Sequence, residues 1–130
     1  MREYIFRGKQ KAGDWVGDWI FGDLIYYSDC KHASISPDEE HCWAVDPDSV
    51  GQFTEKKDIK KRNIFEGDIL LVKSKNPYWS KFNSKHVVMW GNDGWILKDW
   101  GTSDPGLYHI LMMYNCEIIG NIYDNPELLR

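Results

Sequence analysis

The sequence predicts an all-β protein, with a small SH3-like barrel or sandwich core, additional hairpins and one or two single-turn helices. The chain is rich in large rings, with seven Trp, seven Tyr and five Phe, and such rings supply much of the burial in domains built from short strands. Residues 69–72 (ILLV) are apolar on both faces of a strand, which requires cover on both sides. At 130 residues, we expect a single domain over residues 1–130.

The expected elements follow from local patterns along the chain. Residues 91–94 (GNDG) separate two β-type segments and are typical of a tight hairpin turn. Gly67 can supply the positive φ of a turn before the buried strand. A cap-type residue followed by proline predicts single helical turns in 46–51 and 124–129. Polar residues 28–41 indicate an exposed loop or long hairpin tip. We expect β segments at 3–7, 15–27, 42–45, 52–54, 69–72, 85–90, 95–98, 107–114 and 116–123.

Charge and cysteine content restrict the classes of function. A net charge of −4 opposes a nucleic-acid or anionic-membrane role driven by overall charge. No apolar run is long enough to cross a membrane, and the start lacks the apolar region of a secretory signal. Three cysteines, an odd number, favour free thiols in a reducing compartment. We therefore expect a soluble, cytoplasmic protein with no membrane partner.

The nearest approach to a metal site consists of Cys30, His32, His41 and Cys42. Two thiolates and two imidazoles are a suitable zinc set. However, the adjacent His41 and Cys42 would point to opposite faces of a strand, and the usual gap between paired cysteines is missing. We expect no metal and no cofactor.

No arrangement of nucleophile and base can be recognised in the sequence. Any of His32, His41, His86 or His109 could meet a cysteine, but no flanking motif favours a particular pair. Asp93, Asp99 and Asp104 lie near the 91–94 turn and could form a hydrolytic carboxylate pair, but Asp93 and Asp104 are also ordinary turn residues. A hydrolase here would need a concave pocket with buried carboxylates. We expect a protein that is not an enzyme.

The run over residues 55–62 contains the densest positive charge. As a nucleic-acid contact it would place several cations over phosphates. The alternative is a solvated hairpin loop, which the acidic chain as a whole favours. The candidate contact residues are Lys56, Lys57, Lys60, Lys61 and Arg62.

Aromatic residues gather around the predicted 91–94 hairpin. Such density could line a sugar or base groove, or form a surface for self-association, where Trp and Tyr are enriched. We favour a homo-oligomer interface. The candidate residues are Tyr78, Trp79, Trp90, Trp95 and Trp100.

Three blocks of the chain resemble the YopX family of phage and prophage proteins. They are residues 1–9 (MREYIFRGK) with 15–18 (WVGD), residues 45–54 (VDPDSVGQFT) with 64–69 (IFEGDI), and residues 117–128 (EIIGNIYDNPEL). The chain departs from the family at 58–63, where DIKKRN replaces a common Asp-Lys-Asn-Gly turn, and residues 73–114 are variable ground.

This resemblance implies a β-rich fold with a small-barrel core, a homo-oligomer and a phage or prophage setting. It implies no catalytic residues. The partner would be the chain itself and a phage or host macromolecule, with nucleic acid as the alternative. The matching blocks instead contain residues that we interpret as determining the fold: Gly67, Asp68, Gly120, Asn121, Asn125 and Pro126.

Overall fold

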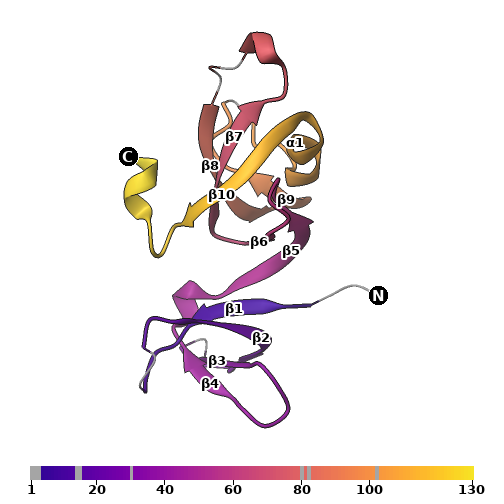
Figure 1. The fold of residues 1–130 in the computed structure, drawn as a ribbon. Coiled ribbons are helices and arrows are strands. Elements are labelled where there is room, and N and C mark those ends of the chain that lie inside the picture. The colour runs from indigo at the N-terminus through magenta and orange to yellow at the C-terminus, as the bar shows by residue number, and fades with distance from the viewer. Residues whose placement is uncertain (1–3, 14–15, 30, 80, 82, 102) are drawn as a thin grey trace. The chain divides into compact units, whose positions relative to one another are not determined.

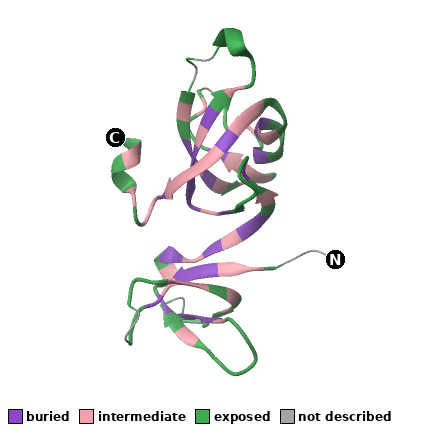
Figure 2. Ribbon diagram, viewed as in Figure 1, coloured by how far each residue is buried: buried purple, intermediate pink, exposed green. Residues whose placement is uncertain are grey.

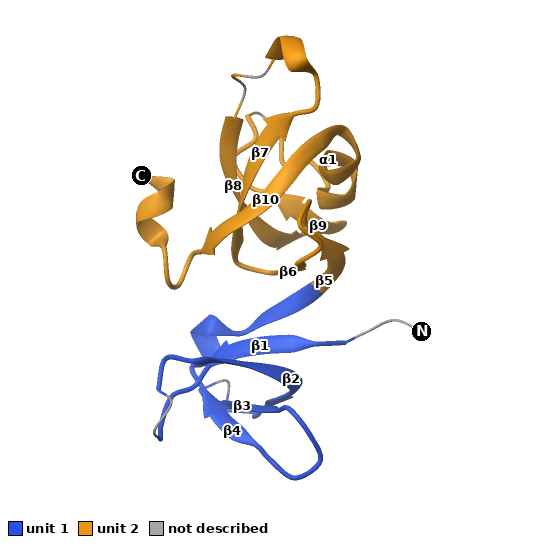
Figure 3. Cartoon of the chain, in the orientation of Figure 1, with its two compact units in different colours: residues 1–53 blue, residues 54–130 orange. Residues whose placement is uncertain are grey.

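The computed structural model describes residues 4–13, 16–29, 31–79, 81, 83–101 and 103–130. Within these residues it contains ten strands, one α-helix and three 3-10 turns (Figure 1). The chain divides into two compact units, residues 1–53 and 54–130 (Figure 3). Each unit has its own hydrophobic cluster. The expectation of one domain over 1–130 concerns independent folding and stays a prediction.

Unit 1 contains five strands of a six-stranded antiparallel sheet, whose sixth strand belongs to unit 2. The hydrogen-bonded order is β4-β3-β2-β1-β5. Its core cluster consists of Ala33, Ile35 and Val45, with Phe6 and Ile20 among the half-buried residues packed against it. The strands are β1 (Phe6–Lys9), β2 (Trp19–Tyr26), β3 (Ala33–Ser36), β4 (Trp43–Val45) and the first residues of β5 (Gly51–Lys57).

Unit 2 contains a four-stranded antiparallel sheet in the order β10-β7-β8-β9. Its strands are β7 (Asp68–Ser74), β8 (Asn83–Gly91), β9 (Gly94–Leu97) and β10 (Tyr114–Asn121). The remaining residues of β5 pair with the short strand β6 (Asn63–Phe65). Helix α1 (Leu107–Met113) lies beside β9 and β10 (Figure 1).

Strand β7 is the centre of the unit 2 core, as the sequence predicts. Leu70 and Val72 are fully buried in the core cluster with Val88. Ile69 is also fully buried, and it lies on the opposite face of the strand because successive side chains alternate. Figure 2 shows that buried residues concentrate on the strands of each unit, whereas the connecting turns are exposed. Cover on both faces is confirmed at Ile69 and Leu70, whereas Leu71 is only half-buried.

Several local predictions are confirmed. Gly91 pairs with Gly94 across the β8–β9 turn, and Gly67 has a φ of 91° before β7. The two expected helical turns are η1 (Pro47–Ser49) and η3 (Pro126–Leu129). The cap of η1 forms as expected, because Asp46 accepts a hydrogen bond from the Asp48 amide at 3.0 Å.

Three predictions need correction. Residues 107–113 are helical rather than a β segment, because Leu107 and Ile110 bury one stripe of a helix. The polar stretch 28–41 contains a buried strand, β3, whose Ala33 and Ile35 belong to the core. Among the described residues the strands form two antiparallel sheets of six and four strands, and no closed barrel is found.

In the part of the chain that the structure describes, no helix is long and apolar enough to cross a membrane.

Candidate binding surface

The carboxylate of Asp58 organises the turn over residues 58–62, which contains Lys60, Lys61 and Arg62, whereas Lys56 and Lys57 lie in β5. It accepts hydrogen bonds from the amides of Lys60 (3.0 Å), Arg62 (2.9 Å) and Ile118 (3.0 Å). Its side chain is completely buried. Burial opposes ionisation, but the amides of Ile118 and Arg62 and the Arg62 guanidinium outweigh it and lower the pKa of Asp58. The turn is therefore held by a buried charged hub.

This turn also covers the outer edge of β10. The amide of Ile59 donates to the carbonyl of Cys116 at 2.9 Å, and the Arg62 guanidinium donates to the carbonyl of Ile118 at 2.6 Å. Part of the other edge of the sheet is covered too, because the Leu97 amide of β9 donates to the carbonyl of Pro105 at 3.0 Å. Edge strands left open would offer unpaired backbone groups to other chains.

Three of the five predicted nucleic-acid contacts are engaged within the chain. Lys60 Nζ lies 2.7 Å from Glu117 Oε1, and Arg62 lies 3.9 Å from the same oxygen. Lys56 Nζ lies 4.9 Å from the ring centre of Tyr108. Lys57 and Lys61 are exposed. A nucleic-acid role for this loop stays the alternative hypothesis, carried mainly by Lys57 and Lys61.

The five predicted aromatic residues do not form one surface. Trp95 and Trp100 are half-buried and pack against the core of unit 2. Trp90 is 60% exposed and meets Trp95 edge-on, with ring centres 4.8 Å apart. Tyr78 and Trp79 lie in η2 (Pro77–Trp79) and are 94% and 65% exposed. Trp79 precedes β8, whereas Trp90 lies near the end of this nine-residue strand, which is about 30 Å long.

A second group of cations, which the sequence analysis missed, lies on the face of β10-β7-β8 opposite the core cluster. Lys73 pairs with Asn83 on β8 and Asn115 on β10, while Leu71 pairs with Lys85 and Glu117. Because alternate residues share a face, Lys73, Lys85 and Glu117 lie together there. Lys75 and Lys81 follow in the connection that carries η2. A sequence signal did exist, since residues 69–92 contain these four lysines and no Asp or Glu.

The two histidines considered above as zinc ligands, His32 and His41, are each held by a neighbouring aspartate. His32 Nδ1 lies 2.6 Å from Asp29, and His41 Nδ1 lies 2.8 Å from Asp38, at the two ends of β3. Cys42 is exposed, and Cys30 lies outside the described residues. No group of three or more His, Cys, Asp or Glu residues suited to a metal is found in the part of the chain that is described.

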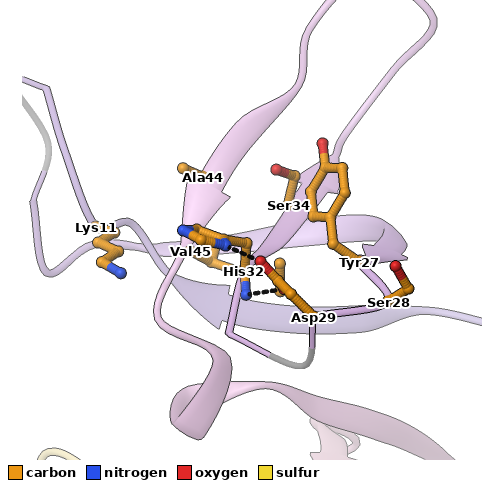
Figure 4. A pocket seen from close by; sticks show the side chains of 9 residues that line it. Lys11, Tyr27, Ser28, Asp29, His32, Ser34, Ala44 and Val45 are labelled. Atoms are coloured by element: carbon orange, nitrogen blue, oxygen red, sulfur yellow. Dashed lines mark hydrogen bonds and ion pairs between the residues drawn. The ribbon is translucent and has the colours of Figure 1, made fainter.

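The Asp29–His32 pair lies in a pocket of ≈ 510 Å³ in unit 1. Figure 4 shows the two side chains turned toward one another, with Tyr27 on one side of the pocket and Lys11 on the other. Asp29 accepts hydrogen bonds from the amide of Lys31, from the His32 ring and from the His32 amide, and these lower the pKa of Asp29. The pair is more than 40% exposed on each side chain. We interpret it as a turn-stabilising contact.

Two of the three candidate carboxylates near the β8–β9 turn line a pocket. It has a volume of ≈ 320 Å³ and is lined by Asp93 and Asp104 together with Trp95 and Ile96. Both carboxylates are exposed, and Asp104 accepts a hydrogen bond from the Asp99 amide at 3.1 Å, as expected of a turn residue. The buried carboxylates that the hydrolase hypothesis needs are therefore not found at this pocket.

The described thiol of unit 2 is in an unreactive setting. Cys116 is 2% exposed, and burial raises the pKa of its thiol to about 11. A catalytic cysteine normally has a lowered pKa instead.

Both ring nitrogens of His86 are engaged within the chain. Nδ1 lies 2.8 Å from the carbonyl oxygen of Lys98, and Nε2 lies 2.8 Å from the hydroxyl of Ser84.

The residues interpreted as a structural signature make structural contacts. Asp68 is 2% exposed and accepts a hydrogen bond from the Phe65 amide at 2.7 Å across the turn at Gly67. Asn121 accepts from the amides of Tyr123 and Asp124. Asn125 accepts from the Asn121 amide at 3.3 Å next to Gly120, and Pro126 begins η3. These contacts close the turn before β7 and the end of β10.

The family model described as YopX protein matches residues 6–130. The chain belongs to the YopX family. A search of curated proteins returned no match to this YopX chain. Among solved structures, it is similar to the crystal structure of protein EF1440 from Enterococcus faecalis, with 19% sequence identity and a TM-score of 0.61. That similarity covers 98% of this chain and 99% of the other, and at this identity it shows a shared fold.

Proposed function

We propose that this YopX-family protein acts by binding rather than by catalysis, and that it assembles with itself through the β8–β9 hairpin. It would serve as an accessory protein of a phage or prophage in the cytoplasm of the bacterial host, acting on a phage or host macromolecule. The observation that carries the assembly is Trp90, a large ring that is 60% exposed at the hairpin end. Trp is enriched among the residues that dominate protein interfaces.

The surroundings of Trp90 support a self-complementary contact. Its ring is fixed against Trp95, so little side-chain freedom is lost on association. The same hairpin carries the ≈ 320 Å³ pocket with apolar walls from Trp95 and Ile96. In a two-fold dimer each copy offers the same patch, so a protruding ring and a recess on one hairpin can serve both copies.

The non-catalytic part of the proposal rests on how the reactive groups are used. The imidazoles of His32 and His41 are occupied by aspartates within their own turns. Burial keeps the Cys116 thiol protonated, with a pKa of about 11. These settings favour structural roles for His32, His41 and Cys116.

Sedimentation velocity over a range of protein concentrations tests the assembly. We expect the wild-type chain to form an oligomer at about 10 μM, and Trp90→Ala to weaken association at least about tenfold, as for a central interface tryptophan. Trp79→Ala is the matched control, because Trp79 is similarly exposed, at 65%, beyond the other end of β8. A wild-type chain that stays monomeric, or equal effects of the two substitutions, would contradict the proposal.

A further inference from the structure

We propose that single-stranded nucleic acid binds to two neighbouring parts of unit 2. One is the part of the β10-β7-β8 face that carries Lys73 and Lys85, and the other is η2. Lys73, Lys81 and Lys85 would contact phosphates, and Tyr78 and Trp79 would stack on bases. This inference rests on the proposed role as a binding protein and names the class of its partner.

The first support is the local charge. The chain carries a net charge of −4, yet residues 69–92 contain four lysines and no acid. Lys73 and Lys85 are diagonal neighbours on adjacent strands, so their side chains start about 7–8 Å apart on one face. Glu117 lies on the same face and interacts with Lys73, but Lys60, at 2.7 Å, and Arg62, at 3.9 Å, share this carboxylate, and the surrounding cations lower the pKa of Glu117. An approaching polyanion would therefore meet two like charges on β7 and β8 that Glu117 does not fully offset.

The second support is the exposed aromatic pair next to these lysines. Tyr78 and Trp79 are 94% and 65% exposed, in the connection between the strands that carry Lys73 and Lys85. Single-strand binding proteins combine a cationic track with rings on which bases stack. Both parts are present here within one hairpin.

The turn that presents the rings is held in place by hydrogen bonds. Asn76 Oδ1 accepts from the Tyr78 amide, and the Asn76 carbonyl accepts from the Trp79 amide, both at 2.9 Å. Pro77 opens η2 and fixes its own φ. Beside Trp79 lies a hollow of ≈ 280 Å³ that is also lined by Ser74, Asn76 and Tyr114. It offers a base both a ring and polar side chains.

These features favour an unpaired strand over a duplex or a membrane. Stacking on Tyr78 or Trp79 needs bases that are not already stacked and paired. The positions beside Lys73 are the polar Asn83 and Asn115, where a membrane-binding face would carry apolar side chains. The face also differs from the 56–62 loop, in which Lys60 and Arg62 form internal ion pairs.

Fluorescence anisotropy of the full chain with a labelled oligothymidylate of about 20 nucleotides tests the inference. We expect affinity to fall between about 50 and 200 mM salt, with a slope of about −0.7 for each phosphate contact. Lys73→Glu/Lys85→Glu should weaken binding at least about tenfold and reduce the slope by about 1.4. Trp79→Ala and Tyr78→Ala should each weaken binding about tenfold. Circular dichroism should show that each variant is folded.

Two matched controls locate the site. Lys57→Glu/Lys61→Glu makes the same charge change in the 56–62 loop, and Trp90→Ala removes a ring of similar exposure. We expect each to change affinity less than about threefold, because neither removes a proposed contact. If the loop variant loses as much affinity as Lys73→Glu/Lys85→Glu, the site assigned here is wrong.

Further outcomes separate this inference from the assembly proposal. Absence of binding at low salt by a wild-type chain that assembles in sedimentation would overturn the inference alone. Binding by a monomeric chain would support the inference and contradict only the assembly. Equal affinity for a duplex without any effect of Trp79→Ala would overturn the single-strand assignment. Binding through Lys73 and Lys85 to phosphatidylserine vesicles but not to the oligonucleotide would identify a membrane surface instead.

Discussion

The buried carboxylate of Asp58 joins two segments that lie 60 residues apart in the chain. It accepts hydrogen bonds from the amides of Lys60 and Arg62 in the basic turn and from the amide of Ile118 in β10. A buried carboxylate is tolerated only when such donors replace its hydration. At the scale of single residues, the hydrogen bonds to the Asp58 carboxylate hold the turn more firmly than the contacts of the lysine side chains around it.

Replacing Asp58 should destabilise the fold more than replacing other acids. Asp58→Asn removes the charge and replaces one acceptor oxygen with an NH2 group, which cannot accept hydrogen bonds from the backbone N–H groups. We therefore expect the free energy of unfolding to fall by about 2–3 kcal/mol. Urea denaturation measures it. Asp93→Asn is the control, because Asp93 is an exposed turn residue, and it should change stability by less than about 0.5 kcal/mol. A similar small change for Asp58→Asn would show that the hub contributes little.

The contribution of Asp58 should also depend on pH in a definite direction. Its pKa is lower in the folded chain than its ordinary value, so the ionised carboxylate stabilises the fold above a pH of about 4. This stability is lost as the pH falls through the pKa of the folded state. The difference in unfolding free energy between wild type and Asp58→Asn should therefore be full at neutral pH and shrink in acid. A difference independent of pH would contradict this account.

At the scale of elements, β7 and the β8–β9 hairpin could be predicted because their signals are local. Ile69 to Val72 is apolar at every position, and Asn92-Asp93 between glycines is a turn sequence. Helix α1 was missed because its Tyr, Ile and Met residues also suit a strand. The spacing of Leu107, Ile110 and Leu111 was the available helical signal.

The end of β10 depends on the absence of a side chain at Gly120. A Cβ there would lie 2.6 Å from Asn125 Oδ1 and 2.9 Å from Leu128 Cδ1. Gly120→Ala should therefore displace η3, with a loss of about 1–3 kcal/mol and faster amide exchange in residues 126–129. Gly106→Ala is the control, since a Cβ at Gly106 meets open space. Unchanged exchange in η3 after Gly120→Ala would show that Asn125 and Leu128 adjust without cost.

At the scale of the whole molecule, the candidate surface needed the strand register as well as the sequence. The lysines of residues 69–92 are visible as a series, but only the pairing of β7 with β8 shows that Lys73 and Lys85 share a face. From the sequence alone, the cations of the 56–62 loop have no evident acidic partner beyond the loop, because Glu117 is distant in sequence. Folding brings its carboxylate to 2.7 Å from Lys60. Pairings between distant segments do not follow from local patterns.

Each unit contains one described cysteine, and the two should differ in reactivity. Cys42 in unit 1 is exposed, whereas Cys116 belongs to the core of unit 2. With a pKa of about 11, only about one Cys116 in a thousand is a thiolate at a pH of about 8. Iodoacetamide should label Cys42 rapidly and Cys116 only when unit 2 opens, as peptide mass spectrometry can measure. Equal labelling rates in the native protein would show that the core of unit 2 is accessible.

The covered edges of the unit 2 sheet determine what kind of assembly can grow from it. The 58–62 turn closes β10, and Pro105 closes part of β9. Copies therefore cannot add strand after strand at β10, which is how filaments and amyloid extend. A contact made by side chains at a single hairpin end is satisfied once two copies have met. Self-association through the β8–β9 hairpin of unit 2 should accordingly stop at a small closed particle rather than continue into a fibre.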